Sequence, residues 1–144
     1  MNKKILICIC FSLVAVCQAK VKVDRGSQFM ADEFNHSLLY HGVNVVYKVH
    51  PFHPTLDAFD ANYSLADEDL KNLNDWGMNV IRLHIAWEGT EPVRGQYNLT
   101  YLETLRSIVQ RAAKYNISVI IDAHQDAWGR RLCGEGMPDW ATKL

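Results

Sequence analysis

Apolar and polar positions alternate along this chain in a way that predicts strands and helices in turn. Residues 42–49 are mostly apolar and β-branched, which is typical of a strand buried on both faces. Residues 79–87 and 117–124 have similar strand patterns. Residues 64–77 and 100–115 carry apolar side chains at helical spacing. The pattern therefore predicts strand, helix, strand, helix, strand.

Polar residues at the starts of the two predicted helices have the spacing of capping boxes. Ser64 and Asp67 are three residues apart, and so are Thr100 and Glu103. In the second helix, the predicted core-facing residues are Leu102, Leu105, Val109 and Ala112.

The segments outside this repeat are less regular. Val21 and Val23 alternate with polar residues, and residues 24–27 resemble a turn, so we expect a short hairpin within residues 21–39. Residues 88–97 contain proline and glycine and are predicted to form a loop.

The strand and helix order narrows the fold class to α/β. Right-handed crossovers between parallel strands are used by open doubly wound sheets and by the closed (β/α)8 TIM barrel. No glycine-rich phosphate-binding fingerprint follows any of the predicted strands, which argues against a dinucleotide-binding fold. A complete barrel needs about 250 residues. On the barrel interpretation, the 144 residues form its N-terminal part.

The first residues have the features of a secretory signal peptide. Two lysines near the N-terminus precede an apolar run at residues 5–16, which is too short to span a membrane comfortably. We predict cleavage after Ala19, with residues 1–19 as signal peptide and 20–144 as the N-terminal part of a catalytic domain. The alternative is an uncleaved anchor. The predicted location is secreted, extracellular or lysosomal.

The glycosylation sequons and the cysteine content also favour a secretory protein. Four asparagines stand in glycosylation sequons: Asn35, Asn62, Asn98 and Asn116. Removal of residues 1–19 would leave Cys133 as the only cysteine. The formal net charge of −1 offers no basic surface, so neither nucleic acid nor anionic lipid is an expected partner.

Polar residues near the ends of the second and third strands share one face of the predicted sheet. Arg82 and His84 have the same strand parity, and so do Asp122, His124 and Asp126. The opposite parity is apolar and suits packing against helices. Because sites in α/β folds gather at the carboxyl ends of strands, we predict a polar cleft there. The alternative is an ion pair between Arg82 and Asp122 that only joins the strands.

Other chemistry at these positions is less well supported. His124 and Asp126 with His84 could form three metal ligands, but no fourth ligand has suitable spacing, so no metal and no cofactor are expected. Three tryptophans near strand ends could stack on sugar rings or fill the core: Trp87, Trp128 and Trp140. Trp76, on a helical face, is expected in the core.

Several motifs together resemble glycoside hydrolase family 5, and within it the endoglycoceramidases. The broader motifs are residues 41–44 and residues 79–83 with Trp87. The more specific ones are the Asp-Ala-His-Gln-Asp motif at 122–126 and the segment 133–140, which begins Cys-Gly-Glu-Gly. The resemblance covers nearly all of residues 21–144.

The resemblance implies an incomplete (β/α)8 TIM barrel and a retaining hydrolase that cleaves the bond between oligosaccharide and ceramide. In such enzymes two glutamates, on the fourth and seventh strands, act as acid/base and nucleophile. Neither strand is in this chain, so none of its residues is expected to be catalytic. The alternatives are a family 5 β-glucanase and a non-catalytic short form that binds glycolipid.

The resemblance also implies roles for individual residues. Arg82 would support the nucleophile and help to keep it negatively charged. His124, Asp126 and Lys48 would bind the substrate sugar. The expected partner is a glycosphingolipid or another β-glycoside, with membrane lipid as substrate only. Three acidic residues are expected to be loop or substrate-rim residues: Glu88, Glu91 and Glu135.

Overall fold

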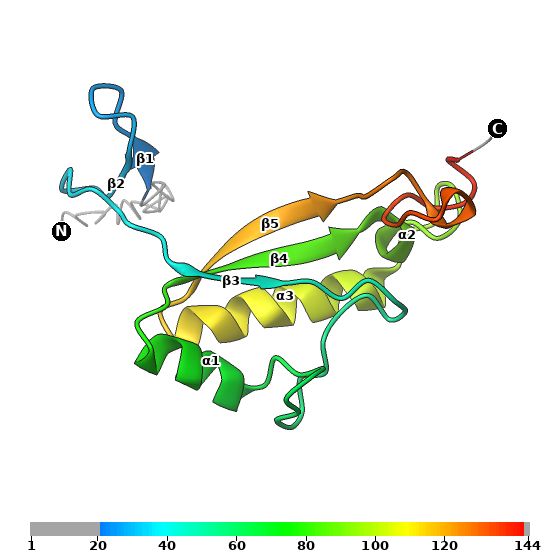
Figure 1. The fold of residues 1–144 in the computed structure, drawn as a ribbon, viewed down its shortest axis with the longest axis horizontal. Coiled ribbons are helices and arrows are strands. Elements are labelled where there is room, and N and C mark those ends of the chain that lie inside the picture. Colours follow the sequence, from blue (N-terminus) through cyan, green and yellow to red (C-terminus); the bar gives the residue numbers. More distant parts are fainter. Residues whose placement is uncertain (1–20, 143–144) are drawn as a thin grey trace, which may run out of the picture. The chain divides into compact units, whose positions relative to one another are not determined.

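The computed structural model describes residues 21–142 (Figure 1). The chain divides into two compact units, with the boundary between residues 39 and 40. The predicted signal peptide, residues 1–19, lies outside the described residues. Among residues 21–142, no helix is both long and apolar enough to cross a bilayer.

The first unit contains the predicted hairpin. Strand β1 (Lys22–Val23) pairs antiparallel with β2 (Met30–Ala31). Asp24 stabilises the turn, since its carboxylate accepts hydrogen bonds from the backbone of Gly26 and Ser27 and from the Ser27 hydroxyl. The hairpin prediction is confirmed.

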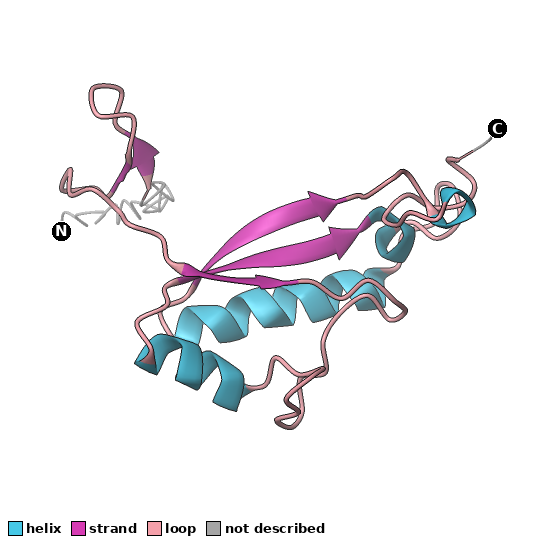
Figure 2. Cartoon of the chain, viewed as in Figure 1, coloured by secondary structure: helices cyan, strands magenta, loops and turns pink. Residues whose placement is uncertain are grey.

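The second unit contains a parallel three-stranded sheet with helices on one side. Its strands are β3 (Gly42–Val45), β4 (Val80–Ala86) and β5 (Ser118–His124), in that spatial order. The longer helices are α1 (Asp67–Asp75) and α3 (Leu99–Lys114). Both lie on the same side of the sheet (Figure 2). The predicted strand and helix order is confirmed. The polar side chains of β4 and β5 lie on the other face of the sheet.

The core lies between the sheet and these two helices. The helix-facing residues of β4, Ile81 and Leu83, are essentially inaccessible to solvent. They pack in one cluster with residues of α1 and α3, namely Leu70, Leu73, Tyr101, Leu105, Ile108 and Ala112. Burial of these side chains is the main source of stability in this unit.

The buried face of α3 differs partly from the predicted one. Leu105 and Ala112 are buried as expected, but Tyr101 and Ile108 replace Leu102 and Val109. Tyr101 turns inward because its hydroxyl accepts a hydrogen bond from the Ala86 backbone nitrogen at 3.2 Å.

Neither predicted capping box forms. Helix α1 begins at Asp67 itself, and the carboxylate of Asp69 instead accepts hydrogen bonds from the Ala66 backbone nitrogen at 2.8 Å and from the Ser64 hydroxyl. The predicted pairing of Ser64 with Asp67 was therefore wrong, because the acid two residues later reaches the same donors.

Helix α3 begins one residue earlier than predicted. The side chain of Asn98 accepts a hydrogen bond from the Tyr101 backbone nitrogen at 3.1 Å and so caps the helix. The predicted Thr100–Glu103 box was wrong, since Thr100 already lies inside the helix.

Three further predictions need correction. Strand β3 ends at Val45 rather than near residue 49. It is not buried on both faces, since Gly42, Val43 and Asn44 are exposed and Val45 is only partly buried. The predicted loop at 88–97 begins with a short helix, α2 (Trp87–Thr90).

Trp76 was predicted to lie in the core, but it is 69% exposed. It lies beside an open cavity of about 530 Å³, which Val43 and Leu73 also line.

Candidate sugar-binding site

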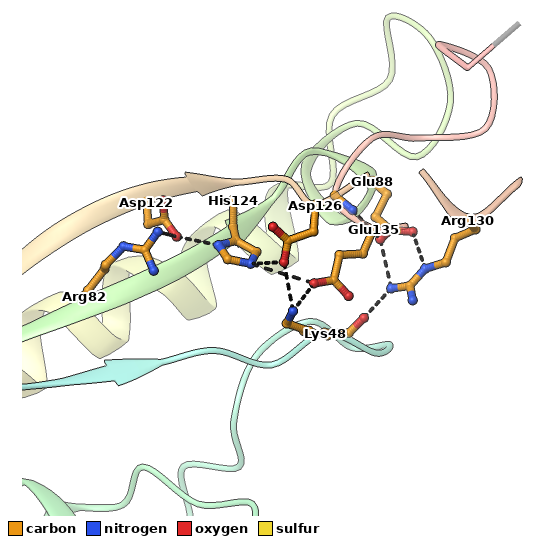
Figure 3. A network of polar contacts seen from close by, with 9 residues as sticks. Lys48, Arg82, Glu88, Asp122, His124, Asp126, Arg130 and Glu135 are labelled. Atoms are coloured by element: carbon orange, nitrogen blue, oxygen red, sulfur yellow. Dashed lines mark hydrogen bonds and ion pairs between the residues drawn. The ribbon is translucent and has the colours of Figure 1, made fainter. Parts of the chain in front are cut away.

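The carboxyl ends of β4 and β5 present their polar side chains on the face of the sheet opposite the helices. The register pairs His84 with Asp122 and Ala86 with His124, so these positions share one face. Arg82 Nη2 lies 2.8 Å from Asp122 Oδ2, and His124 Nδ1 lies 2.8 Å from the same oxygen (Figure 3). Arg82 and His124 are therefore neighbours, and the alternative ion pair of Arg82 with Asp122 also forms.

Two loop residues complete a polar cluster at the end of β5. Lys48, three residues beyond β3, places its Nζ 3.0 Å from Asp126 Oδ2 and in direct contact with Glu135 Oε1. His124 Nε2 lies 3.3 Å from Asp126 Oδ2 and 3.7 Å from Glu135 Oε1. The structure thus brings together all three residues predicted to bind sugar, namely Lys48, His124 and Asp126 (Figure 3).

Glu135 belongs to this cluster, although the sequence placed it only at a loop or rim. Its side chain is 13% exposed. A backbone bridge aligns it with Asp126, with the Glu135 nitrogen donating to the Asp126 carbonyl at 2.8 Å. A Cβ at Gly134 would lie 2.2 Å from the Asp126 carbonyl oxygen, and one at Gly136 would lie 2.3 Å from that of His124. The glycines flanking Glu135 were the sequence signal for this close approach.

The charges of this cluster stabilise one another. Contacts with Glu135 and then Asp126 raise the pKa of the Lys48 ammonium, and Lys48 in turn lowers the pKa of Asp126. Lys48 therefore remains a donor and Asp126 an acceptor across the ordinary pH range. About half of each side chain is open to solvent, which leaves both accessible to a ligand.

His84 lies beneath the cluster in a different environment. It is only 2% exposed, and its ring centroid is 4.9 Å from that of His124. Burial lowers the pKa of His84, with the nearby His124 as the second cause. Neither ring nitrogen has a hydrogen-bond partner among the described residues. At neutral pH His84 is uncharged and supports His124 by ring contact.

Three groups in the cluster have atom types that bind metals. One ligand atom from each of His124, Asp126 and Glu135 lies within 4.8 Å of the others. The third residue of this group is therefore Glu135, and not His84 as in the metal-site alternative considered from the sequence. The Lys48 ammonium already contacts both carboxylates, so a positive charge from the protein itself occupies this position.

The other predicted rim acids form bonds within the loops. The Glu88 side chain is 13% exposed and pairs with Arg130, which holds it among the loops. Glu91 accepts hydrogen bonds from the Gly95 backbone nitrogen at 2.7 Å and the Trp87 ring nitrogen at 2.8 Å, and these contacts lower its pKa.

The three candidate tryptophans differ in their surroundings. Trp87 and Trp140 pack edge to face, with ring centroids 5.3 Å apart, and Trp140 donates to the Glu91 carbonyl at 2.9 Å. Trp128 is 62% exposed. Of the three, Trp128 has the most ring surface open to a sugar.

Comparison with known families now connects this geometry to a class of protein. Residues 42–142 match the family model described as cellulase, glycosyl hydrolase family 5. The chain belongs to glycosyl hydrolase family 5. The match covers the whole described sheet of the second unit, so the strands that carry Arg82 and His124 are family 5 strands.

Within family 5, the chain is similar to endoglycoceramidases. An endoglycoceramidase of Cyanea nozakii is 42% identical over 122 residues, covering 85% of this chain and 24% of that protein. The crystal structure of an endogalactoceramidase has a TM-score of 0.68 at 26% identity and covers 88% of this chain and 30% of its own. The structure of endo-glycoceramidase II from Rhodococcus sp. in its ganglioside GM3 complex has a TM-score of 0.63 at 26% identity. The match covers 80% of this chain and 27% of that one.

These comparisons confirm two predictions. The resemblance to family 5 endoglycoceramidases is correct, and the three-stranded sheet is part of a TIM barrel, incomplete in this chain. The chain spans about a quarter of the length of the curated relatives it matches.

Proposed function

We propose that the protein carrying this chain is a retaining glycoside hydrolase that cleaves the β-linkage between oligosaccharide and ceramide in glycosphingolipids. The observation that carries this proposal is the cluster of Lys48, His124, Asp126 and Glu135 at the end of β5. The similarity to endoglycoceramidases, one of them in complex with a ganglioside, supports ceramide-linked glycan as the substrate class.

The cluster has the donors and acceptors that sugar hydroxyls require. A hydroxyl both donates and accepts, so it pairs well with a carboxylate and an ammonium that lie side by side. Asp126 can accept from one hydroxyl while Lys48 donates to its neighbour, because their charged groups are 3.0 Å apart. His124 Nε2 faces the same carboxylates and offers a third contact.

The bond cleavage itself would depend on residues outside this chain. In a retaining hydrolase the acid/base and the nucleophile are carboxyl groups about 5–5.5 Å apart. Arg82 lies farther from the carboxyl ends of the strands than His124, and Asp122 holds it at 2.8 Å. In the complete barrel its guanidinium would favour the negatively charged form of a nearby nucleophile. None of the residues of this chain is assigned the acid/base or nucleophile role.

We further propose that the protein follows the secretory route and carries glycans, with residues 1–19 removed and residues 20–144 forming the N-terminal part of the catalytic domain. The charged start and apolar run of residues 1–19 support this route. The sequon asparagines are all on the surface: Asn35, Asn62, Asn98 and Asn116.

A hydrolysis assay on the full-length protein tests the proposed activity. Purified protein is incubated separately with a ganglioside and with a soluble β-glucan, and the products are separated by mass spectrometry. We expect release of the intact oligosaccharide and of ceramide from the ganglioside. Cleavage of the glucan alone would reject this proposal in favour of a β-glucanase, which the cellulase description of the family match favours as second candidate. Ganglioside binding without turnover would identify a glycolipid-binding protein.

A further inference from the structure

We propose that Arg130 is a positioning residue, which holds Lys48 and Glu135 in the geometry that binds the sugar. This inference rests on the proposed function, because it concerns the same site. Arg130 begins the short 3-10 helix η1 (Arg130–Leu132) in the loop after β5.

The Arg130 guanidinium joins the loops that follow all three strands of the sheet. Its Nη2 donates to the backbone carbonyl of Lys48, after β3. Its Nε and Nη2 donate to the two oxygens of Glu88, after β4, at 3.2 and 2.9 Å (Figure 3). Its carbon Cζ lies 5.9 Å from the ring centroid of Phe52. One side chain therefore fixes the Lys48 backbone to the second and third loops.

Glu88 connects Arg130 to Glu135, which is the partner of Lys48 in the ion pair. Its Oε1 accepts a hydrogen bond from the Gly136 backbone nitrogen at 3.1 Å, and its own backbone nitrogen donates to the Gly136 carbonyl at 2.9 Å. Gly136 directly follows Glu135 in the chain. Arg130 thus acts on Lys48 directly and on Glu135 through Glu88, so it controls both sides of the Lys48–Glu135 contact.

The burial of Glu88 distinguishes this arrangement from an ordinary surface ion pair. Exposed ion pairs contribute roughly 0–1 kcal/mol, whereas removing the partner of a buried charge leaves that charge uncompensated. Glu88 is 13% exposed and Arg130 is 41% exposed. The planar fork of an arginine matches the two carboxylate oxygens while a nitrogen also reaches a carbonyl. A lysine has one nitrogen and cannot reproduce all of these contacts.

The experiment compares Arg130→Met with Arg131→Met in the full-length enzyme. Arg131 is the matched control, because it lies in the same 3-10 helix and its only described ion pair is an exposed one, to Asp139 at 3.7 Å. For Arg130→Met we expect the KM for ganglioside to rise about tenfold while kcat changes less than about threefold, since loss of ground-state binding acts on KM. For Arg131→Met we expect both constants to stay within about twofold of the wild type.

A second readout does not depend on turnover. The rate at which an amine-reactive reagent labels Lys48 is measured by mass spectrometry of the intact, folded enzyme. A lysine released from its two carboxylates loses its proton more readily, so labelling should be about threefold faster or more in Arg130→Met and unchanged in Arg131→Met. An inactive wild type would reject the proposed function, and the labelling rates would still test the role of Arg130.

The inference is overturned if Arg130→Met keeps both the wild-type KM and the wild-type labelling rate of Lys48. It is also overturned if only the melting temperature falls, because that result indicates a purely structural role. Should Arg130→Met fail to fold, Arg130→Lys decides the question. We expect Arg130→Lys to give an intermediate KM and labelling rate, and wild-type values for both would overturn the inference.

Discussion

Asp122 and His124 are joined by a 2.8 Å contact between Oδ2 of the carboxylate and Nδ1 of the imidazole. A carboxylate only accepts hydrogen bonds, so Nδ1 carries the proton in this contact. The other ring nitrogen, Nε2, is thereby turned toward Asp126 and Glu135. Asp122 thus determines the orientation in which His124 meets a ligand.

Substitution of Asp122 tests the strength of its ion pair with Arg82. We expect Asp122→Asn to lower the free energy of unfolding by about 1–3 kcal/mol, because the partly buried Arg82 loses its charged partner. Chemical denaturation of the full-length protein measures this change. Asp75→Asn is the control, since its ion pair with Lys71 is exposed, and we expect a change below about 0.5 kcal/mol. Equal effects of the two substitutions would contradict this account.

Removal of the His124 imidazole should affect turnover more than folding. We expect His124→Ala to lower kcat/KM for ganglioside roughly 10- to 100-fold, the range for losing a hydrogen bond to or from a charged group. The melting temperature should change little, since His124 lies outside the apolar cluster. His36→Ala is the control, because this exposed histidine lies in the hairpin unit. Unchanged kcat/KM in His124→Ala would remove it from the site.

His84 should make the protein sensitive to mild acid. Its pKa is lowered in the folded state by burial, so below the ordinary histidine pKa of about 6.5 the unfolded state binds more protons. The contribution to stability is complete above about pH 6.5 and is lost as the pH falls toward the lowered pKa.

We therefore expect His84→Leu to lose less stability than the wild type between about pH 7.5 and about pH 5. Denaturation curves at the two pH values measure the difference. A variant with the same acid sensitivity as the wild type would show that other groups are responsible.

The start of α3 offers a test of the fold alone. Asn98→Ala should lower the free energy of unfolding by about 1 kcal/mol, because it removes the cap of the Tyr101 backbone nitrogen. Thr100→Ala is the matched control from the rejected capping box, and we expect a smaller effect. Expression in bacteria keeps the Asn98 sequon free of glycan. A larger effect at Thr100 would restore the original prediction.

The sequence predicted the sheet well because strand parity carries direct information about faces. The alternation of Arg82 and His84 with Ile81 and Leu83 was enough to separate the polar face from the core. Capping was predicted less well, since Ser64 could pair with Asp67 or with Asp69, and only the three-dimensional path selects Asp69.

Long-range loop contacts were the main limit of prediction for the site. Glu135 reaches the cluster through a backbone bridge across nine residues, and Arg130 contacts Lys48 across 82 residues. No periodic pattern connects such positions. Burial was overestimated for outer positions of the sheet, because in a complete barrel they face elements that this chain does not contain. Ile121, on the helix-facing side of β5, is 54% exposed.

The outer strands β3 and β5 each pair on one side only within the described part of the chain. Their remaining backbone donors and acceptors need partners, which a barrel supplies by closing on itself. A preparation of these residues alone can satisfy them with water or with the same strands of another molecule. Work on the site therefore calls for the polypeptide with its neighbouring strands attached, or for a second fragment that supplies those strands in trans.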